Sequence, residues 1–151
     1  MINVREILAK KSIPANTIGS GSRIIEALKK LDMVNLSYLI VKEGDSFKGI
    51  FCERDYCRNV VLKGRSSHEN TVDEVMTVDL PIVQLYDTVE HCMNAMNQNK
   101  TRYLLAFDGD EFRGVITIHD LLREVIASKQ AVFDHVIAGQ LIDYDEGGKV
   151  Y

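Results

Sequence analysis

The chain has 151 residues, of which 46% are hydrophobic and 26% charged, and its 18 basic and 22 acidic residues give a net charge of −4. The length suits about one domain, and the apolar share excludes a disordered or low-complexity chain. No apolar run approaches the roughly 18–20 residues that span a bilayer, and there is no basic excess of the kind that binds nucleic acid. We therefore expect no membrane and no nucleic-acid partner.

The first half of the chain predicts helix, hairpin and helix in that order. Ser22 is the expected N-cap of a helix whose apolar positions recur every three or four residues. Glu43-Gly44-Asp45 joins two apolar runs and predicts a hairpin turn, because Gly and Asp tolerate positive φ. The expected elements are a helix over 22–31, strands over 38–41 and 47–52, a helix over 55–63 and a linker over 64–70.

The second half predicts the same order again. Asp87 and Glu90 have the spacing of a capping box and predict the start of a helix. Asp108-Gly109-Asp110 joins the next two apolar runs as a second hairpin turn. The expected elements are strands over 103–107 and 112–118, a helix over 120–129, an apolar helical stripe over 130–141 and a frayed end over 143–151. The stripe packs either on its own domain or across a dimer.

The two halves are copies of one unit. Shifting the sequence by 65 residues aligns 36–58 with 101–123, with 8 identities in 23 positions and no gap. The identical pairs are Tyr38/Tyr103, Leu39/Leu104, Gly44/Gly109, Asp45/Asp110, Phe47/Phe112, Gly49/Gly114, Asp55/Asp120 and Arg58/Arg123. The segment 4–8 also resembles 72–76. We expect a first repeat at 1–66, a second at 67–128, and a helix with a flexible tail at 129–151.

Each repeat is predicted to be strand, helix, strand, strand, helix, an α/β (α+β) unit. One unit of about 65 residues buries too little surface to be stable alone, so two units packed sheet to sheet are expected to share a core.

At the corner where the third strand ends, each copy places a small polar residue, Cys52 or Thr117, three positions before an aspartate, Asp55 or Asp120. Helix capping explains either residue alone. A hydroxyl and a carboxylate at a helix start also suit a sugar phosphate.

The corner sequences Gly49-Ile-Phe-Cys-Glu-Arg-Asp55 and Gly114-Val-Ile-Thr-Ile-His-Asp120 resemble the nucleotide-binding signature of the cystathionine-β-synthase (CBS) domain family. The phrase Val72-Asp73-Glu74-Val75-Met76-Thr77 is similar to the usual opening of that family. The resemblance covers roughly residues 1–128 and implies the tandem form, the Bateman module. It implies two clefts between the repeats that bind AMP, ADP, ATP, NAD or S-adenosylmethionine as regulatory ligands, with no catalytic cofactor.

The resemblance also implies roles for individual residues. Asp120 with Thr117, and Asp55 with Cys52, would hold the ribose. The residues expected near phosphate are Arg54, His119, Lys100 and Arg102, and those expected against adenine are Ile82 with Tyr103 and Ile18 with Tyr38. Cys52 stands where the family has Thr or Ser, and a thiol is a weak donor. We therefore expect the corner of Thr117 and Asp120 to be the better preserved site.

The leading hypothesis is a non-enzymatic sensor that signals the level of an adenine nucleotide, as in energy sensing, to a separate effector protein. A homodimer is implied by the resemblance. The alternative is a structural homodimerisation module with empty clefts, and an enzyme is a distant third because His119 beside Asp120 has no nucleophile. The odd number of cysteines, the absence of a zinc-ligand spacing and of a secretion signal predict a cytoplasmic chain with no metal.

Overall fold

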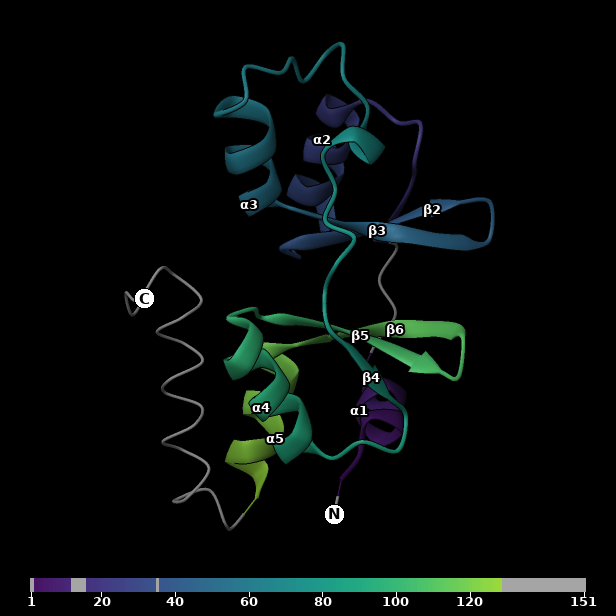
Figure 1. Ribbon diagram of the computed structural model, residues 1–151, viewed down its shortest axis with the longest axis vertical. Coiled ribbons are helices and arrows are strands. Elements are labelled where there is room, and N and C mark those ends of the chain that lie inside the picture. The colour runs from purple at the N-terminus through teal and green to yellow at the C-terminus, as the bar shows by residue number, and fades with distance from the viewer. Residues whose placement is uncertain (1, 12–15, 35, 129–151) are drawn as a thin grey trace. The chain divides into compact units, whose positions relative to one another are not determined.

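The computed structural model describes residues 2–11, 16–34 and 36–128. They form two compact units, drawn in Figure 1. The first-repeat unit lies within Ser12–Asp79. Among the described residues, the second-repeat unit combines 2–11 with 80–128. The predicted helical stripe over 130–141 and the end over 143–151 lie outside the described residues.

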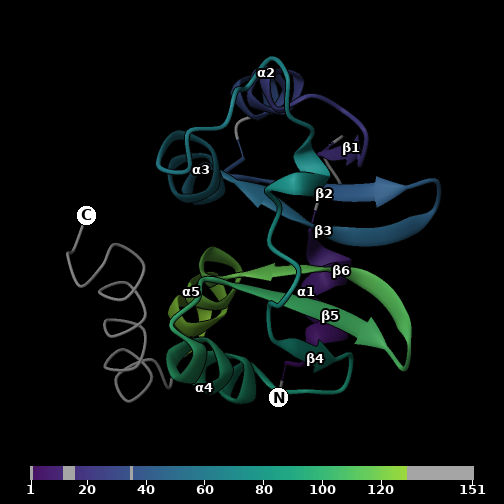
Figure 2. The ribbon, with the colours of Figure 1, turned by 45° about the horizontal axis from the view of Figure 1, so that its top comes forward.

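The first-repeat unit is a three-stranded sheet with helices. Strand β1 pairs in parallel with β2, and β2 pairs antiparallel with β3. Its elements are β1 (Thr17–Gly19), α2 (Ile24–Val34), β2 (Tyr38–Glu43), β3 (Ser46–Cys52), α3 (Glu53–Asp55), the π-helix η1 (Tyr56–Val61) and the 3-10 helix η2 (Val72–Glu74). In Figure 2, α2 and α3 lie over the same side of this sheet.

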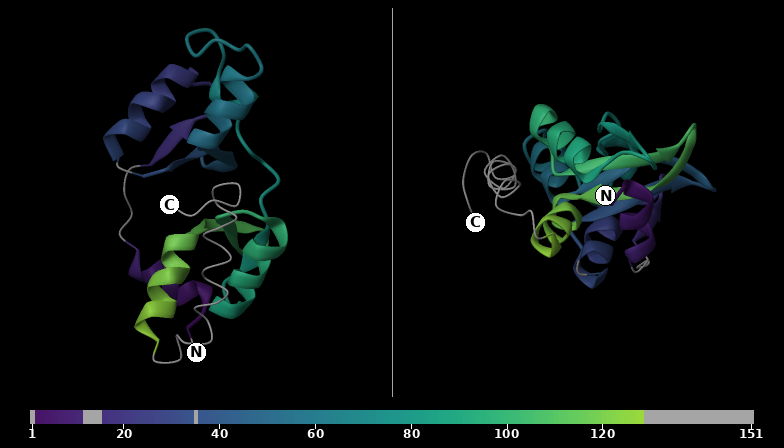
Figure 3. Two further views of the ribbon diagram at one scale, coloured as in Figure 1. Left: turned by 90° about the vertical axis from the view of Figure 1, so that its left-hand side faces the viewer. Right: turned by 90° about the horizontal axis from the view of Figure 1, so that it is seen from below.

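The second-repeat unit repeats that plan, and its helix α1 comes from the start of the chain. Strands β4, β5 and β6 form a sheet with the same order and directions. Its elements are α1 (Val4–Lys10), β4 (Ile82–Gln84), α4 (Val89–Asn99), β5 (Tyr103–Asp108), β6 (Glu111–Thr117) and α5 (Ile118–Ala127). Helices α4 and α5 pack against each other on one face of the sheet (Figure 3).

The repeated register explains why the two corners match. Tyr38 lies opposite Cys52 in one sheet, and Tyr103 lies opposite Thr117 in the other. Each hairpin turns at a glycine with positive φ, 60° at Gly44 and 62° at Gly109. The predicted strand–helix–strand–strand–helix order is therefore confirmed in both copies.

Two of the predicted helix caps are wrong by one residue. Helix α2 begins at Ile24, so Ser22 lies one position before the cap, and its carbonyl accepts instead from the Val72 N–H at 2.8 Å. Helix α4 is capped by the Thr88 hydroxyl, which accepts from the His91 N–H at 3.1 Å. Asp87 instead accepts from the Gln84 N–H at 2.7 Å. At α4 the neighbours Asp87 and Thr88 carry a carboxylate and a hydroxyl, which are both good caps, so sequence alone does not separate them.

The similar segments 4–8 and 72–76 pack on the opposite copy from the one they precede. Val4 and Ile7 of α1 belong to the core of the second-repeat unit. Val72 and Val75 belong to the core of the first-repeat unit. We call residues 2–11 and 71–79 the opening segments. They are exchanged between the copies, because each one packs in the core of the repeat that it does not directly precede. The predicted repeat boundaries at 66/67 and 128/129 come from the sequence. The division of the chain into domains at these positions stays a prediction.

A glycine at the same place in both copies makes room for these opening segments. A Cβ on Gly49 would lie 2.7 Å from the Thr77 carbonyl oxygen and 2.9 Å from Met76 Sδ. A Cβ on Gly114 would lie 3.0 Å from Leu8 Cδ2. Beside Gly49, Ile50 and Thr77 exchange backbone hydrogen bonds of 2.9 and 2.8 Å. The repeated glycine therefore has a packing cause that does not involve a ligand.

Candidate functional site

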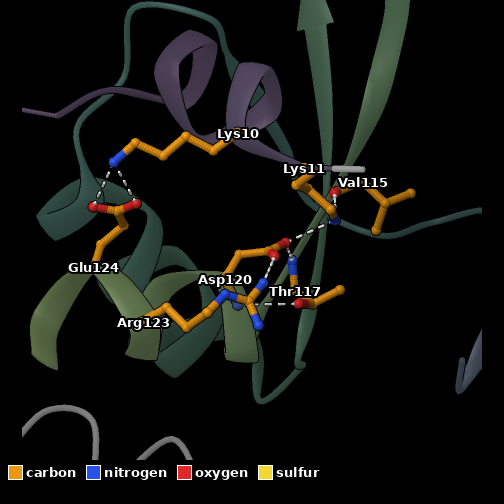
Figure 4. Close-up of polar contacts among 7 residues, drawn as sticks. All are labelled: Lys10, Lys11, Val115, Thr117, Asp120, Arg123 and Glu124. Carbon is orange, nitrogen blue, oxygen red and sulfur yellow. Dashed lines mark hydrogen bonds and ion pairs between the residues drawn. The ribbon is translucent and has the colours of Figure 1, made fainter. Parts of the chain in front are cut away.

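The corner of the second-repeat unit is a capping box at the start of α5. The Thr117 hydroxyl accepts from the Asp120 N–H at 3.2 Å, and Asp120 Oδ2 accepts from the Thr117 N–H at 2.9 Å (Figure 4). The two residues thus satisfy backbone donors that the first turn leaves without helical partners. Asp120 is only 3% exposed. A carboxylate so deeply placed is fixed in direction.

Two cations, neither of them predicted, hold the Asp120 carboxylate. Lys11 Nζ lies 2.8 Å from Oδ2 and donates also to the Val115 carbonyl at 2.8 Å. Arg123 Nη2 lies 2.5 Å from Oδ1. Figure 4 shows both converging on Asp120 from different elements. The neighbouring Lys10–Glu124 pair, at 3.1 Å, also joins the opening segment to α5. This corner therefore carries more positive than negative side-chain charge.

The corner of the first-repeat unit has the same backbone but different partners. Asp55 Oδ2 accepts from the Cys52 N–H at 2.9 Å and from the Cys52 thiol at 3.3 Å. The Thr77 hydroxyl donates to Oδ1 at 2.5 Å. Thr77, like Lys11, comes from an opening segment, so in each unit that segment supplies a donor to the corner aspartate. The thiol and the hydroxyl bind the two Asp55 oxygens that correspond to those held at Asp120 by an ammonium and a guanidinium.

Burial raises the pKa of both titratable side chains of this corner. It raises the pKa of the Asp55 carboxyl above its usual value, although the Thr77 hydroxyl, the Cys52 donors and the nearby Arg54 charge oppose the rise. Burial, together with the Asp55 charge, raises the pKa of Cys52 to about 11. Cys52 is therefore a thiol at neutral pH, which means that it is a weak donor and a poor nucleophile.

Five of the other predicted residues lie beside a corner. Tyr38 and Tyr103 are buried and face their corners across the strand register. The Arg102 carbonyl accepts from the Ile118 N–H at 2.9 Å, and its guanidinium lies 5.5 Å from the centre of the Tyr103 ring. Arg54 is half-buried in α3, and His119 is exposed on α5.

Three predicted residues lie further along their elements. Lys100 is exposed and ends α4 in a left-handed conformation with φ 50°. Ile18 and Ile82 occupy the short first strand of each sheet, opposite Val41 and Leu105. Ile82 is 56% exposed. Their roles against adenine, like those of the corner residues toward ribose and phosphate, stay predictions.

Sequence reasoning missed three corner residues. Thr77 stands in the opening phrase, and Arg123 is one of the repeat identities, so both carried a signal. Lys11 carried none, because its contact joins positions 109 residues apart. Within the described ranges, no three His, Cys, Asp or Glu side chains gather as metal ligands. Nor does any helix there have the length and apolarity needed to cross a membrane.

Two α+β units with an aspartate at the equivalent strand-to-helix corner of each define a duplicated module, and the comparisons with known proteins name the family. The model of the CBS domain matches residues 72–127. A putative signal-transduction protein with CBS domains from Burkholderia ambifaria is 33% identical, with a TM-score of 0.76 over 85% of this chain and 97% of that chain. The chain belongs to the CBS-domain family, as a tandem pair.

Two further relatives add to this assignment. The mitochondrial CBS domain-containing protein CBSX3 of Arabidopsis thaliana is 28% identical over 108 residues, which are 68% of this chain. The chain spans about half of that protein's length, 52%. The crystal structure of CBSX2 in complex with AMP has a TM-score of 0.66 at 19% identity, covering 83% of this chain and 96% of that chain. This last similarity shows the fold.

Proposed function

We propose that this chain is a regulatory module that binds an adenosine ligand, such as AMP, ADP, ATP, NAD or S-adenosylmethionine, at its strand-to-helix corners and performs no catalysis. The observation that carries the proposal is the duplicated corner itself. Asp55 and Asp120, 5% and 3% exposed, are buried acids fixed by three side-chain or backbone donors each. A carboxylate held in this way is a preorganised acceptor for ribose hydroxyls.

The AMP complex of CBSX2 supports this class of ligand, because that protein has the same fold. Binding would act on an effector only through different affinities for two conformations of the module. We also propose that the module signals to a separate effector protein, as in energy sensing. The proposal includes a homodimer with a cytoplasmic location.

The test is a thermal-shift screen of the purified chain with AMP, ADP, ATP, NAD and S-adenosylmethionine, followed by calorimetry. A ligand that binds only the folded state raises the melting temperature. We expect a shift with at least one of the five at millimolar concentration. Asp120→Ala is expected to weaken binding more than Asp55→Ala. Asp110→Ala, in the exposed turn of the same hairpin, is the matched control and is expected to bind like the wild type.

The second candidate is a structural module with unoccupied corners, and one observation favours it. Asp120 is already neutralised by Lys11 and Arg123, which gives it a role in stability without a ligand. The screen separates the two functions, because the structural module shows no thermal shift with any of the five compounds. Turnover of a bound nucleotide, detected by chromatography of the mixture, would overturn the non-enzymatic proposal.

A further inference from the structure

The acceptor capacity of Asp120 limits what can bind there. A carboxylate offers about four lone-pair positions, two on each oxygen. Oδ2 accepts from the Thr117 N–H and from Lys11 Nζ, so it is fully used. Among the described residues, Oδ1 accepts only from Arg123 Nη2 and keeps one position. The two neighbouring hydroxyls of a ribose need two positions, so one of the three present donors must leave before both hydroxyls can bind.

The three donors differ in how easily they leave. The Thr117 N–H is part of the backbone and is fixed by the capping box. Lys11 is 22% exposed in its side chain and has a second acceptor, the Val115 carbonyl, which holds it in place. The Arg123 side chain is 67% exposed, so its guanidinium can turn to solvent, and Lys11 still holds the buried Asp120 carboxylate when it does. Arg123 is therefore the donor that a ligand can displace.

Displacement of Arg123 has a consequence for ligand choice. The freed guanidinium keeps its positive charge and has five N–H donors in a planar fork, a geometry that matches phosphate. A ligand that carries both a ribose and a phosphate can place its two hydroxyls on the two open positions of Oδ1 and supply a new anion to Arg123. An unphosphorylated nucleoside takes the same two positions and leaves the guanidinium without an anion.

We propose that Arg123 is a specificity-determining residue, which exchanges Asp120 for the phosphate of the ligand and so makes this corner prefer nucleotides to nucleosides. The proposal rests on the proposed function, because it assumes that ribose binds at Asp120. It adds to that function a phosphate contact that the sequence did not predict. It also adds a preference for nucleotides over nucleosides. At the other corner the Thr77 hydroxyl holds the equivalent oxygen of Asp55, so this exchange belongs to the second-repeat unit.

The test measures AMP and adenosine binding by calorimetry in wild type, Arg123→Gln and Arg123→Lys. A charge-assisted hydrogen bond changes affinity by about tenfold to a hundredfold, so we expect wild type to prefer AMP by about tenfold or more. In Arg123→Gln the preference should fall by about fivefold or more, while adenosine binds as well as before or better. Arg123→Lys should keep part of the preference, because its charge remains. A variant that merely damaged the fold would lose adenosine binding too.

The controls separate this proposal from the function on which it rests. Arg113→Gln removes an exposed arginine of the hairpin, paired with Asp108 at 3.5 Å, and should leave both affinities unchanged. An unchanged AMP-to-adenosine ratio in Arg123→Gln overturns the proposal while leaving nucleotide binding intact. A loss of preference in Arg58→Gln instead overturns the assignment to the Asp120 corner. If wild type binds neither probe nor any compound of the screen, the proposed function fails and the exchange fails with it.

Discussion

At the scale of single residues, two aspartates at equivalent positions have different electrostatic surroundings. Asp120 is neutralised by an ammonium and a guanidinium, whereas the donors to Asp55 include a hydroxyl and a thiol. Burying a carboxylate costs free energy unless charge or hydrogen bonds offset the loss of water. The partners of the first corner therefore affect two measurable properties, which are the pH dependence of stability at Asp55 and the reactivity of the Cys52 thiol.

The first residue-scale prediction concerns Thr77. Because burial raises the pKa of Asp55 in the folded state, the folded protein holds this proton more tightly than the unfolded chain. The contribution of Asp55 to stability is therefore fully present below about pH 4 and is lost as the pH rises through the raised value. Thr77→Val removes a donor that favours the charged form, so we expect a loss of about 1–3 kcal/mol at pH 7 and a smaller loss near pH 4.

Urea unfolding at the two pH values measures this difference. Thr77→Ser keeps the hydroxyl and should show little dependence of its stability change on pH. An equal loss for Thr77→Val at both pH values would show that the hydroxyl does not stabilise the carboxylate charge.

The second residue-scale prediction concerns the thiols. Cys52 and Cys92 are buried, with pKa values raised to about 11 and about 12, while Cys57 is exposed. The thiolate is the reactive form, so at pH 8 the native protein should react with iodoacetamide at Cys57 alone. Mass spectrometry of the peptides identifies the modified cysteine, and unfolding in urea should expose all three. Rapid modification of Cys52 in the native protein would contradict the burial described for this corner.

At the scale of elements, each third strand has to accept an opening segment beside it. At Gly49 of β3 a Cβ would lie within 3 Å of Thr77 and Met76, and the adjacent pair Ile50–Thr77 forms an antiparallel bridge. A side chain at this position meets backbone, which cannot move aside as a flexible side chain can.

The element-scale prediction follows from that contact. Gly49→Ala should destabilise the protein by about 1–3 kcal/mol, because the added methyl lies too close to the Thr77 carbonyl and Met76. Gly21→Ala is the matched control, since a Cβ there meets no atom of the described residues within 4 Å, and its effect should stay within about 0.5 kcal/mol. Chemical denaturation measures both variants. Equal stabilities of the two would mean that the opening segment shifts without cost.

At the scale of the whole molecule, sequence order and spatial order differ. Helix α1 precedes the first repeat in sequence but packs in the second-repeat unit, and η2 packs in the first-repeat unit. Each hydrophobic core therefore includes apolar residues far away in the chain.

The whole-molecule prediction uses amide hydrogen exchange to detect which unit each opening segment stabilises. Ile7→Ala removes a side chain that is 2% exposed and should cost about 2–5 kcal/mol. The faster exchange should appear in α4 and α5, although Ile7 is nearer in sequence to α2. Val72→Ala is the reciprocal variant and should act on α2 and β2. A response of α2 to Ile7→Ala would show that the opening segment stabilises the repeat that it precedes.

Much of this arrangement follows from local sequence patterns, and the remainder depends on contacts between distant positions. The hairpins were predictable because Asp-Gly turns join apolar runs, and the corner of Thr117 and Asp120 because a capping box needs only a spacing of three. The destination of the opening segments was not, since 4–8 and 72–76 have similar apolar patterns and fit either sheet. The Lys11 contact could not be predicted either, because it depends on that destination.

The exchanged opening segments also bear on what a protease cut would do. A cut in the polar stretch 64–70 leaves two pieces, and neither contains all of the residues that fold together. The shorter piece keeps α1, whose core contacts belong to the longer piece, and the longer piece keeps η2, whose core contacts belong to the shorter one. The fragments therefore complement each other, so the nicked protein should stay associated by non-covalent contacts alone.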